Sequence, residues 1–73
     1  MVMNRDFLEN LVYSYQKELF RYVRFLGAQH SDAEDIVQEA YVIAFNSNGS
    51  GPANQDSDEW ARWLRGVARN LFL

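Results

Sequence analysis

The chain has 73 residues, no cysteine, one histidine and a formal net charge of −3. A chain of this length forms one domain with a thin core, because it buries only about 60% of its unfolded surface. Its apolar fraction of 48% and aromatic fraction of 15% are typical of a globular protein and exclude intrinsic disorder. The absence of cysteine favours a reducing, cytoplasmic location, and together with the single histidine it argues against a structural zinc site.

Nothing in the sequence indicates a membrane or a small-molecule substrate as a partner. No stretch approaches about 18 uncharged apolar residues, and Arg5, Asp6 and Glu9 interrupt any signal-peptide pattern. The net negative charge argues against nucleic-acid binding through the whole surface. A local basic face remains open, because the charged residues of 32–39 are all acidic and those of 62–69 are all basic.

The first predicted helix covers about 5–26. Its apolar residues recur with the period of an α-helix, and Gly27 follows at the usual stop position. These apolar residues are Leu8, Leu11, Val12, Tyr15, Leu19, Tyr22, Val23 and Leu26. The outer face carries Lys17, Arg21 and Arg24, which we interpret as an ordinary solvated surface.

The second predicted helix covers about 31–46 and presents two contrasting faces. Its inward stripe comprises Ala33, Ile36, Val37, Ala40, Tyr41, Ala44 and Phe45. The opposite face gathers Asp35, Gln38, Glu39, Val42 and Asn46. Ser31 and Glu34 have the spacing of a capping box, which explains part of the acidic run but neither Asp35 nor Glu39. We therefore interpret the outward face as a surface for a basic and partly apolar partner.

A loop and a third helix complete the chain. The segment 46–57 is rich in Gly, Asn and Ser, offers almost nothing to bury, and is expected to be a mobile loop. The third predicted helix covers about 57–72, and its apolar stripe comprises Trp60, Trp63, Leu64, Val67, Ala68 and Leu71. Both tryptophans are interpreted as core residues. Three helices that each bury one stripe predict a single all-α domain over 1–73, a small three-helix bundle.

The other side of the third predicted helix is basic. Arg62, Arg65 and Arg69 project from it, and Asn70 lies on its flank. Guanidinium groups in a row can each meet a phosphate, and an asparagine can read a base edge through a paired donor and acceptor. Such a row is also common on a merely solvated helix, so it is a weak indication of DNA binding by itself.

Catalysis is not indicated. The carboxylates of Asp35 and Glu39 could serve acid–base chemistry, but no nucleophile or metal-ligand spacing accompanies them. Gly49 and Gly51 follow a helix, and no lysine comes after them, so they do not form a phosphate-binding loop. We therefore expect a binding module that has no enzymatic activity, no metal and no cofactor.

Two segments in this order resemble a known family. D-A-E-D-I-V-Q-E-A-Y at 32–41 is followed by W-L-R-G-V-A-R-N-L at 63–71. Together they are similar to the second conserved region of extracytoplasmic-function (ECF) sigma factors, the promoter-specificity subunits of bacterial RNA polymerase. R-Y-V-R-F-L-G at 21–27 fits the same pattern, so the resemblance covers nearly the whole chain. It implies a function in transcription initiation, with core RNA polymerase and promoter DNA as partners.

The resemblance also implies roles for single residues. The family's D-x-x-Q-E motif, which grips the Arg-rich clamp helices of the polymerase β′ subunit, falls on Asp35, Gln38 and Glu39, with Val42 at its edge. The third-helix motif implies that Asn70 and the neighbouring arginines approach the minus-ten promoter element, and that the preceding loop captures a flipped base. An anti-sigma protein that covers these faces is expected as a further partner.

The sequence departs from the family at three places. Gly66 stands where many members carry a basic residue, which puts one DNA contact in doubt. The loop between Asn46 and Asp58 has no aromatic residue to stack on an unpaired base, so Trp60 is the nearest candidate. The chain stops at Leu73 without the family's second DNA-binding domain, which we interpret as a cut through a longer protein.

Two other functions stay open at this point. The acidic face could dock another basic helix in a protein-interaction module that has no role at DNA, and the arginines would then be solvated only. A helix-turn-helix DNA binder is disfavoured, because about a dozen loop residues separate the last two helices.

Overall fold

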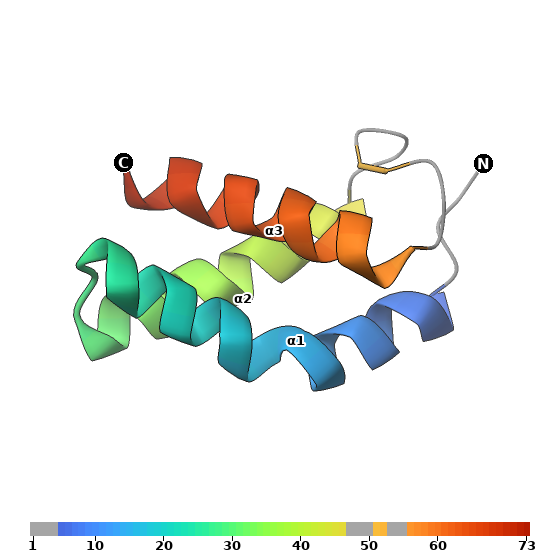
Figure 1. Ribbon diagram of the computed structural model, residues 1–73, viewed down its shortest axis with the longest axis horizontal. Helices are drawn as coiled ribbons and strands as arrows, with labels where there is room; N and C mark the ends of the chain where they lie inside the picture. The colour runs from blue at the N-terminus through green and yellow to red at the C-terminus, as the bar shows by residue number, and fades with distance from the viewer. Residues whose placement is uncertain (1–4, 47–50, 53–55) are drawn as a thin grey trace.

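The computed structural model describes residues 5–46, 51–52 and 56–73. It contains three helices, α1 (Arg5–Leu26), α2 (His30–Asn46) and α3 (Ser57–Phe72), and each of them contacts the other two. Figure 1 shows that α2 runs back along α1 and that α3 runs in the same direction as α1. The described residues hold no strand, and the expected all-α three-helix fold is confirmed.

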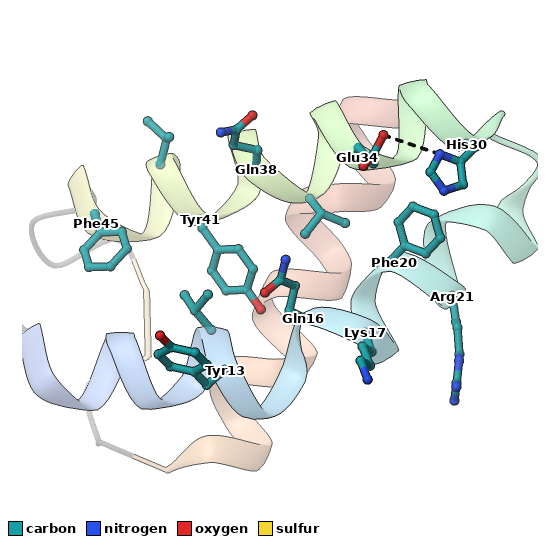
Figure 2. A pocket seen from close by; sticks show the side chains of 13 residues that line it. Tyr13, Gln16, Lys17, Phe20, Arg21, His30, Glu34, Gln38, Tyr41 and Phe45 are labelled. Atoms are coloured by element: carbon teal, nitrogen blue, oxygen red, sulfur yellow. Dashed lines mark ion pairs between the residues drawn. The ribbon is translucent and has the colours of Figure 1, made fainter.

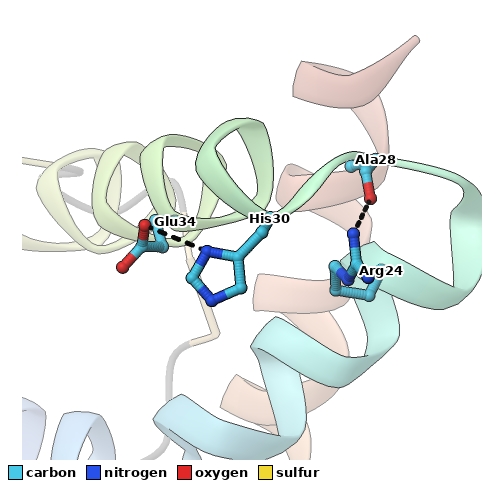
Figure 3. A network of polar contacts seen from close by, with 4 residues as sticks. All are labelled: Arg24, Ala28, His30 and Glu34. Carbon is cyan, nitrogen blue, oxygen red and sulfur yellow. Dashed lines mark hydrogen bonds and ion pairs between the residues drawn. The ribbon is translucent and has the colours of Figure 1, made fainter.

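The turn between α1 and α2 has the hydrogen bonds of a Schellman motif. Gly27 has a φ of 118°, a conformation that side chains other than glycine adopt only with strain. The Gly27 amide donates to the Arg24 carbonyl at 3.0 Å, and the Ala28 amide donates to the Val23 carbonyl at 3.3 Å. Arg24 Nη1 also donates to the Ala28 carbonyl at 3.1 Å (Figure 3). These bonds end α1 and turn the chain at once into an antiparallel second helix.

The start of α2 differs from the expected one. The helix begins at His30, and its first turn includes a bond from the Ala33 amide to the Gln29 carbonyl of 2.8 Å. Ser31 therefore lies inside the first turn and not at a capping position. Glu34 approaches His30 instead, with its Oε1 3.4 Å from the imidazole Nδ1 (Figure 3). One extra residue of helix places the histidine at i and the glutamate at i+4, where side chains meet.

The start of α3 is capped by Asp56. Its side-chain Oδ1 accepts hydrogen bonds from the amides of Asp58 at 2.9 Å and Glu59 at 3.3 Å. Both of these acidic residues also lie in the first turn, where the helix dipole favours negative charge. The cap fixes where α3 begins and so sets which residues of the helix face inward.

The core lies where the apolar stripes of the three helices meet. Its largest fully buried side chains are Trp60, Leu19, Leu64 and Val23. Trp60 is 1% exposed and packs edge-on against Phe7, with 6.3 Å between ring centroids. A Cβ atom at Gly51 would lie 2.6 Å from Trp60, so the backbone at this position covers the indole closely. Of the expected mobile loop, residues 47–50 and 53–55 lie outside the described residues.

Phe45 and Tyr41 of α2 were both predicted to be buried, and the structure confirms this for only one of them. Phe45 was expected in the buried stripe, but its side chain is 41% exposed, because it lies at the edge of the packed face near the end of α2. Tyr41 is buried, and its hydroxyl has no hydrogen-bond partner. Burial raises the pKa of Tyr41 to about 12, and the nearby Tyr15 hydroxyl contributes to this shift.

The unpartnered Tyr41 hydroxyl predicts a loss of stability at high pH. The pKa in the folded chain lies above the ordinary value of about 10, so folding favours the protonated hydroxyl. This contribution is complete below pH ~10, and about 2 kcal/mol of unfolding free energy is lost as pH rises through ~12. Urea unfolding between pH 8 and 12 should show a steeper decline for the wild type than for Tyr41→Phe.

The matched control is Tyr13→Phe, which changes an exposed tyrosine of α1. It should keep the wild-type decline. At neutral pH, Tyr41→Phe should unfold no more easily than the wild type, because it removes a buried polar group that has no partner. A large loss of stability at pH 7 would contradict this account.

Candidate functional site

The outward face of α2 is exposed as the sequence predicted. Asp35, Gln38 and Glu39 are all exposed, and Val42 is 51% exposed. Within the described part of the chain, neither of the two carboxylates forms an ion pair or a hydrogen bond. The face therefore presents two unneutralised negative charges beside a carboxamide and an exposed apolar side chain. Its role in binding stays a prediction.

The exposure of this face follows from how α2 packs. Its opposite side is buried, and the contact residues are small along much of its length: Ala33, Ala40 and Ala44. Alanines let a helix approach its neighbours closely, and α2 contacts both α1 and α3. With that side occupied, residues half a turn away can only face solvent.

A groove runs beside this face, between α1 and α2. It has a volume of about 950 Å³, and the described residues that line it all belong to these two helices. Gln38 and Val42 belong to its lining, whereas Asp35 and Glu39 do not. Figure 2 shows Gln38 at the α2 edge, with Tyr41 crossing the floor toward α1. The four residues predicted for one binding surface are thus divided between an acidic outer strip and the edge of an apolar groove.

The three arginines of α3 do not form one open row. Arg62 and Arg69 are exposed, but Arg65 is half-buried and its Nη1 donates a hydrogen bond of 2.7 Å to the Tyr15 hydroxyl of α1. Arg62 and Arg65 also line a recess together with the acidic Glu18 and Asp58. The positive potential of this face is therefore carried mainly by Arg62 and Arg69. The periodicity of the sequence predicted that Arg65 points away from the apolar stripe of its own helix. It did not predict the hydrogen bond to Tyr15 of α1.

Asn70 is exposed near the end of the same helix. Trp60, the nearest candidate for stacking on an unpaired base, is covered by core residues, so that expectation is wrong. Its ring meets Trp63 edge-on, with 5.1 Å between centroids, and Trp63 is half-buried. The part of the loop expected to capture a base falls mostly outside the described residues.

Two strongly exposed aromatic residues of α1, Tyr13 and Phe25, were missed from the sequence. Tyr13 is 88% exposed and lines the groove between α1 and α2. The sequence signal for Tyr13 is an aromatic residue one position away from the apolar stripe of α1, between Val12 and Ser14.

Within the ranges 5–46, 51–52 and 56–73, no helix is both long and apolar enough to cross a membrane. The same ranges contain no cluster of His, Cys, Asp and Glu that could hold a metal ion.

Comparison with known proteins identifies the family. The model of the sigma-70 region 2 family matches residues 11–73, which include most of α1 and all of α2 and α3. The chain therefore belongs to the sigma-70 region 2 family. This family is a non-enzymatic domain of sigma factors that binds core RNA polymerase and takes part in promoter melting. The searches of curated proteins and of solved structures found no match.

The hydrogen bond between Arg65 and Tyr15 predicts a difference between two tyrosine variants. Tyr15→Phe removes the acceptor of a partly buried guanidinium and should lower the unfolding free energy by about 1–2 kcal/mol. Tyr41→Phe is the matched control, since it deletes a buried hydroxyl that has no partner. Urea unfolding at pH 7 measures both. Equal stability of Tyr15→Phe and the wild type would mean that Arg65 gains nothing from this contact.

Proposed function

We propose that this chain is the region 2 domain of an ECF-type sigma factor and that it acts in the cytoplasm. In this proposal, the outward face of α2 docks on the clamp helices of the polymerase β′ subunit. Asp35 and Glu39 would pair with basic side chains, Gln38 would exchange hydrogen bonds, and Val42 would contact an apolar side chain. The observation that carries the proposal is the exposure of two carboxylates that have no partner among the described residues and that lie within the range matched by the family model.

The electrostatics of this face support docking on an Arg-rich helix. A carboxylate without an internal partner loses no internal ion pair when it meets a guanidinium, so the new contact is not offset. The exposed Val42 adds apolar area next to the charges, and interfaces commonly combine an apolar centre with a polar rim. An anti-sigma protein is proposed as a further partner, because it would have to cover the same exposed residues.

The outer side of α3 is proposed to face promoter DNA near the minus-ten element. Arg62 and Arg69 are exposed and can meet phosphates, and Asn70 beside them can reach a base edge. The hydrogen bond to Tyr15 gives Arg65 a different place in this proposal. Arg65 would hold α3 against α1, and its guanidinium would reach DNA only if the hydrogen bond to Tyr15 were broken.

A second candidate function is a protein-interaction module that has no role at DNA. The internal hydrogen bond of Arg65 favours this alternative, as does the recess that Arg62 shares with Glu18 and Asp58. Both reduce the positive charge that α3 offers to phosphates. The acidic face of α2 would then bind a basic helix of another protein.

Charge reversal on α2 tests the docking proposal. Binding of the 73-residue chain to a β′ clamp-helix fragment, measured by titration calorimetry, should weaken by about 2–5 kcal/mol for Asp35→Lys combined with Glu39→Lys. The single variants Glu39→Lys and Glu18→Lys change the net charge equally at exposed helical positions. Only the first should weaken binding strongly. Equal affinities for these two single variants would end the assignment of this face.

Two substitutions at Gly66 test the DNA-binding proposal. This glycine is exposed on α3, and a Cβ atom there meets nothing within 4 Å. Gly66→Ala and Gly66→Lys should therefore both stabilise the helix by about 0.5–1 kcal/mol. Only Gly66→Lys should bind DNA more tightly than the wild type, and its salt dependence should steepen by about 0.7–0.9 in the log–log slope. Fluorescence anisotropy with a labelled oligonucleotide over a salt series measures both quantities.

The alanine variant separates charge from helix stability in this experiment. If Gly66→Lys and Gly66→Ala bind DNA alike at every salt concentration, the outer side of α3 does not touch the phosphates. The protein-interaction alternative would then be favoured.

A further inference from the structure

A hydrogen bond between α1 and α3 fixes the guanidinium group of Arg65. Its Nη1 donates to the Tyr15 hydroxyl at 2.7 Å, a short distance that is typical of a charged donor. Tyr15 is 7% exposed and its side chain belongs to the core, so the acceptor is held in place by packing. Of the three arginines of α3, Arg65 alone has a hydrogen-bond partner within the described residues. This contact therefore determines where one positive charge of α3 lies.

The position of Arg65 around α3 explains why it reaches α1. At about 100° per residue, Arg62 and Arg69 point within about 20° of each other, whereas Arg65 lies about 60° from Arg62. That rotation is toward α1, because Ala61, which lies further round on the same side, lines the recess between the two helices. Figure 1 shows that α1 and α3 run in the same direction, and the two helices are in contact. Two arginines therefore point to solvent and the third crosses to the neighbouring helix.

The recess around this hydrogen bond contains negative charge on both helices. It has a volume of about 340 Å³, and the described residues that line it belong to α1 and α3. Glu18 of α1 and Asp58 of α3 are among them, and both carboxylates are exposed. They repel a phosphate that approaches Arg65 where it lies, because like charges within a few ångströms are poorly screened by salt. Arg65 has to leave Tyr15 before it can meet a phosphate.

Leaving Tyr15 is unfavourable for both groups. The half-buried guanidinium loses its acceptor, and the buried hydroxyl loses the charged donor that it contacts. A new contact between Arg65 and a phosphate must offset both losses before it adds any affinity. Arg62 and Arg69 form no hydrogen bond or ion pair within the described residues, so contacts of these two arginines with phosphates carry no such penalty.

We propose that Tyr15 holds Arg65 away from DNA, so that α3 offers two arginine contacts to phosphates and not three. This inference rests on the proposed DNA-binding role of α3, and it makes Tyr15 a positioning residue for that surface. Contacts between arginine and phosphate do not depend on base sequence, so the missing contact lowers the affinity for every DNA strand alike. Tyr15 limits the non-specific binding of DNA without changing the net charge of the chain.

Tyr15→Phe tests the proposal, because it removes the acceptor and keeps both the aromatic ring and the net charge. Fluorescence anisotropy with a labelled single-stranded oligonucleotide at about 0.1 M salt should show binding at least about 3-fold tighter than that of the wild type, with a log–log salt slope steeper by about 0.7. A purely structural role for Tyr15 gives the opposite result, since the variant is expected to be less stable. The matched control is Tyr41→Phe, which removes a buried hydroxyl without a partner and should leave both quantities unchanged.

Arg65→Gln identifies the source of the gain. In the wild-type background it should lower the salt slope by less than half as much as Arg69→Gln does, because Arg65 is already held by Tyr15. In the Tyr15→Phe background it should abolish the whole gain. If Tyr15→Phe does not fold, the comparison of Arg65→Gln with Arg69→Gln still decides the question. Equal losses of slope for these two variants would overturn the proposal.

The same series of variants distinguishes this inference from the proposed DNA-binding face. If Arg69→Gln lowers the salt slope and Tyr15→Phe binds as the wild type does, α3 faces DNA but Tyr15 does not hold Arg65 back. If neither Arg62→Gln nor Arg69→Gln changes the slope, the DNA-binding face is wrong and this inference fails with it. A gain from Tyr15→Phe on one strand but not on a second strand of unrelated sequence would also overturn it, because Arg65 would then read bases.

Discussion

The packing of α2 is the constraint on which the proposed docking face depends. Its alanine-rich side is buried against α1 and α3, and this packing determines which residues of α2 face the solvent. Asp35 and Glu39 are held on the solvent side because the side opposite them is occupied. A larger side chain at Ala40, which is fully buried, would push the helices apart and displace the proposed docking face together with the core.

Much of the fold and of the acidic face could be predicted from the sequence, because both depend on the direction of a residue around its own helix. The period of α2 places Asp35 outward and Ala33 inward without reference to any neighbour. What could not be predicted depends on the neighbouring helix. Arg65 points outward by periodicity, yet it lies close enough to α1 to donate to Tyr15. Trp60 lies at the first turn of α3, where the sequence does not show that Phe7 and Gly51 cover it.

The two basic surfaces of the chain differ in how they are used. On α3, Arg65 donates a hydrogen bond to Tyr15 of α1, so its contact with DNA, if the proposed DNA-binding face is correct, would compete with a contact that holds the bundle together. On α1, Lys17 and Arg21 form no hydrogen bond or ion pair within the described residues, and they border an apolar groove. Among the described residues, these two groups of basic side chains thus lie on different helices of a chain whose net charge is negative.

The close approach of Gly51 to Trp60 gives the chain a built-in optical probe. An indole covered by backbone emits at shorter wavelength than one exposed to water, so a displacement of residue 51 would shift the emission of Trp60. With phenylalanine in place of Trp63, this indole would be the chain's single source of tryptophan fluorescence. The segment that joins α2 to α3 could then be followed in solution, without any attached dye, while the helices themselves stay folded.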